Sequence, residues 1–470
     1  MHDKLKRHAR RQIPAVGRIL EALGRCDLPR PVVVDVIRRK LSAIRAARKV
    51  PDFESIVVLV RRSIEELGAG RLQSMINGTG ILIHTNFGRA PLANQAIRAL
   101  KEIGSGYSNL EYHITTGARG QRGGYIENAL ALLCKAEAAT VVNNCAAALV
   151  LIVRHFVRGK LDGFKRSSSR GSKSEVIISR GELVQIGGGF RISEIIEATG
   201  AKLREVGATN KTTVDDYADA IGQNTAMILK VHRSNFFMSG FVQSPSSDEI
   251  SELARKKRIP FVEDLGSGAV AATEEFGITE HEPTPADVLN SGVDLVCFSG
   301  DKLFGGPQAG IIAGKRRFIG MLKREPLFRA LRCDKLCLAA LQSTVDLHLN
   351  QRHDVIPTLA LMQVSEDELR ARAASICNQL SKQCSELQVV VGRSTAKAGG
   401  GTLPKSKMPS VTIEIAPGNC SPLEFASRLR SATPPVIGYL ANDCFKLDVR
   451  TIFPEQDDLV VAAIRAACIK

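Results

Sequence analysis

The chain has 470 residues, of which 44% are hydrophobic and 24% are charged; this is ordinary for a globular protein and sufficient for two or three domains. No apolar run is long enough to cross a bilayer, and the basic N-terminus lacks the apolar segment of a signal peptide. Eleven cysteines without a Cys-x-x-Cys pair indicate reduced thiols in a cytoplasmic protein, and the lack of clustered Cys and His residues argues against a metal site.

The net charge of +16 is concentrated near the N-terminus. Residues 1–50 contain fourteen Lys or Arg and four Asp or Glu, a net charge of +10. Such a block is typical of a surface that binds an anionic polymer or a membrane, although a solvated helical face is the alternative. Apolar residues from Val16 to Leu23 recur at helical spacing, and prolines interrupt them. Residues 1–65 are therefore predicted to form a basic helical module.

From about residue 75, short Val- and Ile-rich segments alternate with amphipathic segments. This alternation predicts a mainly parallel sheet with helices on both faces, and ligand groups beyond the carboxyl ends of its strands. The expected strands are residues 140–142, 176–179, 227–231, 259–263, 295–298 and 309–313, and the expected helices include 215–221 and 248–255.

Two later segments complete the predicted organisation. The Ser-, Gly-, Lys- and Arg-rich tract at residues 160–174 is expected to be a surface loop, with a phosphate-contacting loop as the alternative. After residue 350, a long helix and strands at 410–415 and 446–449 predict a smaller α+β domain. The expected domains are a helical module at 1–65, a catalytic large domain at 66–345 and a C-terminal small domain at 346–470.

The stretch FSGDKLFGGPQAG, at residues 298–310, places Lys302 on a tight loop between two predicted buried strands. A surface lysine in a turn is the simplest explanation. However, Asp264 lies at the end of the predicted strand 259–263. Small residues also lead from the predicted strand 140–142 into a helix, where backbone N–H groups can bind a phosphate. Lysine, acid and phosphate site together are the parts that hold pyridoxal phosphate as a Schiff base. The candidate cofactor residues are Lys302, Asp264, Ser299, Asn144, Cys145 and Ala146.

Three arginines are candidates for binding a tetrahedral oxyanion, because a guanidinium group offers paired donors. Arg89 ends a stretch that is nearly free of charge. Arg329 and Arg332 are three residues apart and are expected on one helical face. Structural ion pairs are the alternative role for each of them.

Many longer motifs make the chain similar to the bacterial selenocysteine synthase family, the L-seryl-tRNA(Sec) selenium transferases. The shared motifs span nearly the whole length and include HTNFGRAPL (84–92), YSNLEY (107–112), RGELVQIGGGFRI (180–192), KVHRSNF (230–236), EDLGSG (263–268), FSGDKLFGGPQAGII (298–312), RALRCDKLCLAAL (329–341) and GGGTLP (399–404). The chain departs from the usual family pattern at residues 120–125, at Cys145 and at Ala208.

The resemblance implies a large domain of fold type I, the aspartate aminotransferase-like α/β fold of pyridoxal phosphate enzymes. It implies that Lys302 binds the cofactor and that Asp301 and Asn235 are active-site residues. It further implies that Arg89, Arg329 and Arg332 bind selenophosphate, that the N-terminal domain binds tRNA(Sec), and that the protein forms a ring-shaped homodecamer.

The reaction implied by the resemblance converts serine on tRNA(Sec) to selenocysteine, through loss of water to an aminoacrylate and addition of selenium from selenophosphate. A small-molecule lyase of the same fold is one alternative, but it would not need the basic N-terminal segment. An RNA-binding protein without catalysis is another, but the presence of both Asp264 and Lys302 argues against it.

Overall fold

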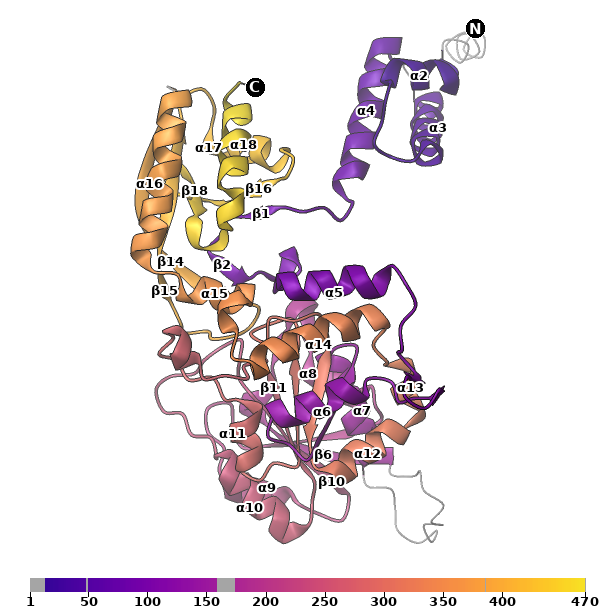
Figure 1. Cartoon of the computed structure of the whole chain (residues 1–470), viewed down its shortest axis with the longest axis vertical. Helices are drawn as coiled ribbons and strands as arrows, with labels where there is room; N and C mark the ends of the chain where they lie inside the picture. Colours follow the sequence, from indigo (N-terminus) through magenta and orange to yellow (C-terminus); the bar gives the residue numbers. More distant parts are fainter. Residues whose placement is uncertain (1–12, 48–49, 159–173, 385, 470) are drawn as a thin grey trace. The chain divides into compact units, whose positions relative to one another are not determined.

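The computed structural model describes residues 13–47, 50–158, 174–384 and 386–469. The chain divides into two compact units, residues 1–75 and 76–470 (Figure 1). Buried hydrophobic clusters lie within each unit. The basic tract expected as a loop lies almost entirely outside the described residues. Among the described residues, no helix is both long enough and apolar enough to cross a membrane.

The N-terminal unit is helical, as predicted. Helices α2 (Val16–Leu23), α3 (Arg30–Ala46) and α4 (Phe53–Ala69) pack around buried aliphatic side chains such as Ile37 and Val60. Several arginines of this unit are exposed, namely Arg18, Arg25, Arg30, Arg38, Arg39 and Arg45. The unit therefore combines an apolar core with a basic surface.

The larger unit contains a seven-stranded sheet in the order β5-β13-β12-β11-β10-β6-β9. All neighbouring strands are parallel except β13, which runs antiparallel to both β12 and β5. The predicted, mainly parallel sheet is thus confirmed, and each expected strand agrees with the observed one to within three residues at either end. The strands are β5 (Ala138–Val142), β6 (Glu175–Ser179), β9 (Lys202–Val206), β10 (Thr225–Val231), β11 (Phe261–Gly266), β12 (Leu295–Ser299) and β13 (Gly310–Gly314).

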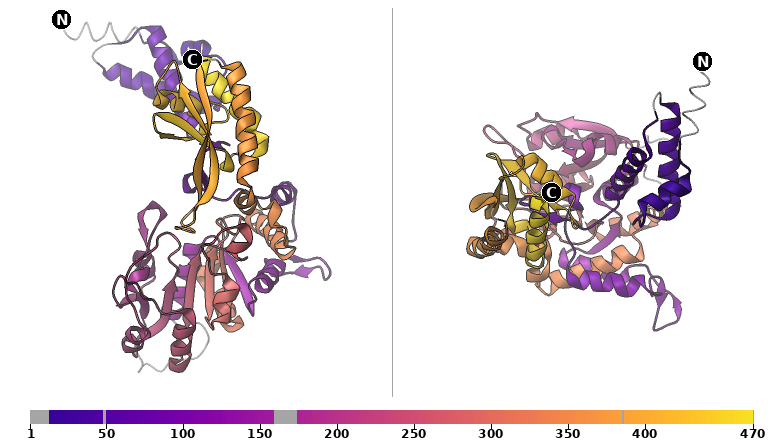
Figure 2. Two further views of the ribbon diagram at one scale, coloured as in Figure 1. Left: turned by 90° about the vertical axis from the view of Figure 1, so that its left-hand side faces the viewer. Right: turned by 90° about the horizontal axis from the view of Figure 1, so that it is seen from above.

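Helices cover both faces of this sheet (Figures 1 and 2). Alternate strand residues enter two separate cores: Ile228 and Val296 lie in one, and Met227 and Leu295 in the other. Burial on both faces explains why strands within the sheet, such as β10, β12 and β13, are almost continuously apolar. One core is covered by α6 (Gly124–Leu133), α9 (Val214–Ala220), α10 (Ser247–Lys257), α11 (Pro285–Asn290) and α14 (Lys335–Leu349), and the other by α7 (Cys145–Arg158), α8 (Ile192–Glu197) and α12 (Arg316–Arg324).

Capping residues set the ends of the helices that were predicted from the sequence. Ser246 caps α10 by accepting a hydrogen bond from the Glu249 N–H, and the Glu249 carboxylate accepts one from the Ser246 N–H. Thr213 and Asp216 form the same reciprocal pair at the start of α9. These caps satisfy backbone donors that a helix cannot pair internally.

A second sheet, in the order β17-β18-β15-β14-β2, also belongs to the larger unit. Its strand β2 (Ile81–Ile83) comes from the start of this unit and pairs parallel with β14 (Leu387–Gly399). The other strands are β15 (Met408–Pro417), β17 (Tyr439–Ala441) and β18 (Cys444–Asp448), and the packed helices are α16 (Glu366–Gln383), α17 (Pro422–Arg430) and α18 (Asp457–Ile469). The β2–β14 pairing holds Ile81 and Ile83 against Gly399 and Gly400 of the glycine-rich segment 399–401.

Candidate active site

The carboxyl ends of β11 and β12 carry the central candidate residues. The strands are neighbours, with Asp264 in register with Cys297, so Asp264 and the loop of Lys302 emerge at the same edge of the sheet. The Leu303 N–H donates to the Ser267 carbonyl at 3.1 Å and ties the two loops together. At Gly268, which has a φ of +76°, a Cβ would lie 2.3 Å from the Ser299 carbonyl oxygen, so the close approach requires glycine.

Lys302 and Asp264 face a common space. A Cβ placed on Gly266 would lie 3.8 Å from Lys302 Nζ, 3.9 Å from Asp264 Oδ1 and 3.6 Å from Ser234 Oγ. Burial raises the pKa of the Asp264 carboxyl group, while the charge of Lys302 acts in the opposite direction with a smaller effect. The predicted lysine and acid are thus brought together, and the structure adds Ser234 to them.

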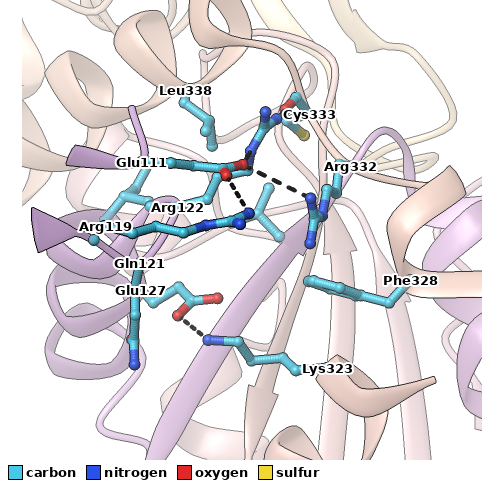
Figure 3. A pocket seen from close by; sticks show the side chains of 14 residues that line it. Glu111, Arg119, Gln121, Arg122, Glu127, Lys323, Phe328, Arg332, Cys333 and Leu338 are labelled. Atoms are coloured by element: carbon cyan, nitrogen blue, oxygen red, sulfur yellow. Dashed lines mark hydrogen bonds and ion pairs between the residues drawn. The ribbon is translucent and has the colours of Figure 1, made fainter. Parts of the chain in front are cut away.

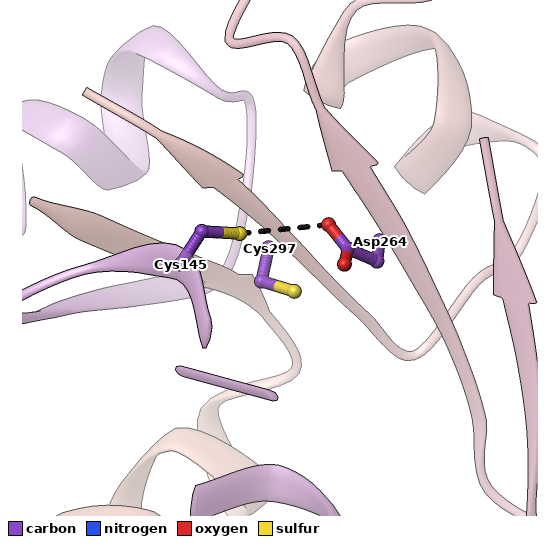
Figure 4. A group of neighbouring side chains, drawn as sticks. All are labelled: Cys145, Asp264 and Cys297. Carbon is purple, nitrogen blue, oxygen red and sulfur yellow. Dashed lines mark hydrogen bonds between the residues drawn. The ribbon is translucent and has the colours of Figure 1, made fainter. Parts of the chain in front are cut away.

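The predicted phosphate-binding residues lie at the start of α7, beside Asp264 (Figure 4). The Asn144 carboxamide oxygen accepts a hydrogen bond from the Ala147 N–H at 2.8 Å and so caps the helix. The Cys145 thiol donates to Asp264 Oδ1 at 3.5 Å, and the Cys297 thiol lies in the same group. Within the described residues, these two thiols and the Asp264 carboxylate are the one set close enough to hold a metal ion, and all three belong to this site.

Asp301 is held by the segment that carries Arg89. The Arg89 guanidinium donates to Asp301 Oδ2 at 2.7 Å, and the Ala90 N–H donates to the Asp301 carbonyl at 3.2 Å. Arg89 adopts a φ of +66°, a left-handed conformation that is uncommon for a residue with a side chain. The imidazole of His84 stacks on Phe87 with ring centres 3.8 Å apart, and burial lowers the pKa of His84.

Three buried polar atoms at these loops lack a hydrogen-bond partner: His84 Nδ1, Ser267 Oγ and Asp301 Oδ1. A buried polar atom without a partner costs on the order of 1–3 kcal/mol. Such atoms, together with an amine and a carboxylate facing the same space, fit a site that is completed by a polar ligand. The residues present are therefore compatible with a phosphate-bearing aromatic cofactor.

Asn235 lies in a different position from the lysine and the acid. The Asn235 side-chain N–H donates to the Gln185 carbonyl at 2.9 Å, and a Cβ placed on Gly401 would lie 3.2 Å from the Asn235 Cβ. Asn235 therefore joins the segment after β10 to the glycine-rich segment at 399–401. Ser234, rather than Asn235, faces the space that Lys302 and Asp264 share.

The buried carboxyl group of Glu182 lies next to the end of β10, the strand that pairs with β11. Glu182 Oε2 accepts a hydrogen bond from the Val231 N–H at 3.0 Å, and Val231 is the register partner of Asp264. Burial raises the pKa of Glu182 to about 7, although the Val231 N–H and the charge of Lys230 act against this rise. The Glu182 carboxyl group thus changes charge near neutral pH.

A group of three arginines surrounds Glu111 beside a cavity of about 310 Å³ (Figure 3). Arg122 Nε lies 3.0 Å and Arg332 Nη1 3.7 Å from Glu111 Oε1, and Arg119 Nη2 lies 2.9 Å from Glu111 Oε2. Hydrogen bonds from Arg122 and Arg119 lower the pKa of Glu111. Lys323, paired with Glu127, lies on another wall of the cavity. The group, called the arginine cluster below, has more positive than negative charge and suits an anion.

The expectation that Arg329 and Arg332 share a helical face is wrong. Helix α13 (Pro326–Ala330) ends before Arg332, which lies in the turn that leads into α14. Helix α13 begins at a proline and is followed by Asp334, which caps α14 by accepting from the Cys337 N–H at 2.8 Å. The start of α14 thus ends the helical periodicity on which the expectation relied. Arg329 is exposed, whereas Arg332 joins the arginine cluster.

A second cavity of about 340 Å³ connects the arginine cluster with the start of α7. Arg332 and Asn144 both line it, together with Gln308 and Cys337. The Asn143 N–H also donates to the Leu331 carbonyl at 2.9 Å, which fixes the two segments side by side. Arg332 therefore neighbours the predicted phosphate-binding residues, while Arg89 contacts Asp301.

Sequence reasoning did not identify Glu111, Arg119, Arg122, Ser234 or Ser267 as site residues. Glu111, Ser234 and Ser267 lie inside motifs that carry the family resemblance, so their positions within those motifs were the available signal. Arg119 and Arg122 lie in a charged loop that resembles an ordinary surface turn. Their common contact with Glu111 becomes visible only in the fold.

Comparisons with known proteins agree with this architecture. The sequence matches the L-seryl-tRNA selenium transferase family over residues 75–453. The L-seryl-tRNA(Sec) selenium transferase of Aquifex aeolicus is 42% identical, covering 95% of this chain and 96% of that protein. The corresponding protein of Geotalea daltonii is 41% identical, covering 97% of this chain and 98% of that protein.

Among solved structures, D-glucosaminate-6-phosphate ammonia-lyase is similar in fold, with a TM-score of 0.57 and 20% identity over 86% of this chain and 97% of that chain. The predicted fold type I is confirmed. The close relatives do not favour the small-molecule lyase alternative. The chain belongs to the L-seryl-tRNA selenium transferases, the family that converts serine on tRNA(Sec) to selenocysteine.

Proposed function

We propose that this chain carries out the conversion with pyridoxal phosphate bound at Lys302 and with selenophosphate bound by arginines. The observation that carries the proposal is the space shared by the Lys302 amine and the Asp264 carboxylate at the ends of two neighbouring strands. When bound, pyridoxal phosphate supplies an electron sink that makes the α-hydrogen of an amino acid acidic.

The residues that would hold this cofactor come from three strand ends. Lys302 provides the amine for a covalent link, and Asp264 provides a carboxylate for the protonated ring nitrogen. The backbone N–H groups of Asn144, Cys145 and Ala146 at the start of α7, with the Ser299 hydroxyl, would bind the phosphate. Burial destabilises the ionised form of Asp264, and a cationic partner such as the protonated ring nitrogen would stabilise it.

The chain's own groups would then handle protons and charge. The Lys302 amine removes the proton at Cα of the seryl group and returns a proton to Cα at the end of the reaction. Asp301, which precedes this lysine in the chain, holds Arg89 through the 2.7 Å ion pair. Arg89, Arg329 and Arg332 bind the tetrahedral oxyanion of selenophosphate, and Asn235 orients the glycine-rich segment next to the site.

The N-terminal unit is proposed to bind tRNA(Sec). Its exposed arginines suit a phosphate backbone, and a folded RNA is recognised largely by shape and backbone contacts. We further propose that the protein works in the cytoplasm, as a homodecamer, with the expected domain boundaries at residues 65/66 and 345/346.

The arginine assignment is tested by separating the two halves of the reaction. Arg332→Ala should still bind seryl-tRNA and release water from the seryl group, but should use selenophosphate about ten- to a hundredfold less well, because one charged contact is worth about 1.5–3 kcal/mol. Single-turnover assays with seryl-tRNA alone, and then with donor added, measure both halves. Pyruvoyl-tRNA, the hydrolysis product of an interrupted reaction, should accumulate.

Arg393→Ala is the matched control, because Arg393 is exposed on β14 and is only loosely paired with Glu366 at 4.0 Å. It should leave both halves unchanged. Failure of Arg332→Ala to react with seryl-tRNA, at unchanged tRNA affinity, would assign Arg332 to the seryl or cofactor site instead.

The RNA assignment is tested by deleting residues 1–75, which form a separate compact unit. The remaining unit should keep the absorbance band of the lysine-bound cofactor but lose most of its affinity for tRNA. The affinity of the full chain should fall steeply with salt, because binding releases counterions from RNA. Equal affinity with and without the unit would refute its role in RNA binding.

A further inference from the structure

Two cysteines lie together where α14 begins. Cys333 is buried, with 4% of its surface exposed, and its carbonyl oxygen accepts a hydrogen bond from Arg122 Nη1 at 2.6 Å. Cys337 is partly exposed in the first turn of α14, and its N–H donates to Asp334. Figure 3 shows Cys333 beside Arg332 of the arginine cluster. The pair therefore adjoins the proposed selenophosphate site.

Cys333 and Cys337 both line the 340 Å³ cavity, and the Cys337 Sγ lies 3.4 Å from the Gln308 carbonyl oxygen. The interaction between the two thiols lowers the pKa of Cys337 and raises that of Cys333, while burial and the charges of Asp334 and Asp301 oppose the ionisation of Cys337. A small molecule in that cavity can reach Cys337, and Cys333 is the adjacent thiol that can react next.

We propose that Cys333 and Cys337 form a reversible redox site that a peroxide closes to a disulfide. The Cys337 thiolate attacks one oxygen of the peroxide, which gives a sulfenic acid and releases hydroxide, or alkoxide from an organic peroxide. The Cys333 thiol then displaces the sulfenic oxygen, which leaves as water, and the S–S bond forms. Two thiols are oxidised and one peroxide is reduced; a dithiol reductant reverses the reaction by exchange.

Another thiol pair in the same chain provides an internal comparison. Cys384 and Cys468 also interact, but burial and the neighbouring thiols raise the pKa of Cys468 to about 12. Because the thiolate is the reactive form, Cys337 should react with peroxide at least about tenfold faster than Cys468 near neutral pH. Each pair combines a buried and a partly exposed thiol, so the ionisation of the partly exposed thiol and the cavity beside Cys337 are what distinguish the pairs.

The test is to treat the reduced full-length chain with hydrogen peroxide, block the remaining thiols and digest with trypsin. Lys335 separates the two cysteines, so the disulfide joins peptides 333–335 and 336–352, with a loss of two hydrogen atoms. The Cys333→Ser variant should instead carry sulfinic acid at Cys337, because no thiol remains to resolve the sulfenic acid. The Cys384→Ser control should form the 333–337 disulfide at the unchanged rate.

Oxidation of Cys337 without the cross-link, or equal rates at Cys337 and Cys468, would overturn the proposal. A cross-link between Cys145 and Cys297 in its place would do so too, because those thiols also lie in contact.

The consequence for the arginine cluster rests on the proposed function. Closing the disulfide shifts Cys333, whose carbonyl holds Arg122 and whose neighbour is Arg332, so inorganic phosphate should bind the oxidised chain about two- to fivefold more weakly. Isothermal titration of both forms measures this. If neither form binds phosphate, the arginine assignment is wrong while the peptide map still stands. If phosphate binds both forms equally, the disulfide has no effect on this site.

Discussion

The pKa values of the carboxyl groups are shifted in opposite directions on the two sides of the candidate site. At the strand ends, burial raises the pKa of Asp264 and raises that of Glu182 to about 7. In the arginine cluster, hydrogen bonds from Arg122 and Arg119 lower the pKa of Glu111. On the strand-end side, burial thus favours protonated carboxyl groups, and Glu182 changes charge near neutral pH. The arginine side instead favours a charged carboxylate and suits an anion.

The two sides also differ in how the fold builds them. Asp264 and Ser299 stand on the adjacent strands β11 and β12, whose pairing fixes their spacing, and Lys302 lies on the loop that directly follows β12. Glu111, Arg119 and Arg122 come from the segment that includes the hairpin of β3 (Tyr112–His113) and β4 (Ala118–Arg119), while Arg332 lies between two helices. Catalytic groups on rigid strands hold their geometry more tightly than binding groups on exposed loops.

The largest effect is expected at the strand-end side. Lys302→Ala should lower turnover by at least about 10³-fold, because it removes the proposed covalent link and the general base together. The absorbance band of the lysine-bound cofactor should disappear as well. Absorbance spectra and single-turnover assays measure the two consequences separately.

Lys256→Ala is the control, since Lys256 is exposed and pairs with Glu252 within one helix. Its spectrum and rate should equal those of the parent chain. A Lys302→Ala variant that retained the band would place the cofactor link on another lysine.

The strand-end side could be predicted from the sequence, because aliphatic runs give the strands and the residue after each run lies at a known edge of the sheet. Lys302 and Asp264 were found in this way, and the order of the parallel strands brought them together. Asn235 was predicted as a site residue, but the hydrogen bond to Gln185 that positions it joins residues 50 apart in the chain. Such a pairing leaves no periodic signal.

The arginine cluster was less accessible to sequence reasoning. Arg332 and Glu111 are separated by 221 residues, and no local pattern relates their positions. The spacing of Arg329 and Arg332 predicted a helix, but Asp334 starts a new helix and ends the periodicity. Capping residues at closely spaced helix boundaries thus override the spacing of side chains.

A second prediction uses the pKa of Glu182. The folded value of about 7 lies above the ordinary value of 4.5, so the folded chain binds the extra proton between these two pH values. Stability therefore falls as pH rises from about 4.5 through 7, and the full penalty, about 3 kcal/mol, is present above pH 7. Glu182→Gln keeps an acceptor for the Val231 N–H without the charge. It should match the parent chain near pH 4.5 and exceed its melting temperature at pH 8.

Glu205→Gln serves as the comparison, because Glu205 pairs with Arg180 at an exposed position. Its melting temperature should track that of the parent chain across the same pH range. If the advantage of Glu182→Gln were constant with pH, removal of the titrating charge would not be its cause.

The smallest effect is expected at the arginine cluster, where Glu111 competes with any bound anion. Glu111→Gln leaves Arg119, Arg122 and Arg332 in place but removes the carboxylate that they share. Inorganic phosphate should then bind about two- to fivefold more tightly at low salt, because exposed charge contacts are worth up to about 1 kcal/mol. The gain should shrink as salt screens the cluster. Isothermal titration at two ionic strengths measures both trends, with Glu205→Gln again expected to bind like the parent chain. Weaker phosphate binding by Glu111→Gln would instead mean that the carboxylate holds the three guanidinium groups in their binding geometry, so that orientation outweighs charge at this side of the site.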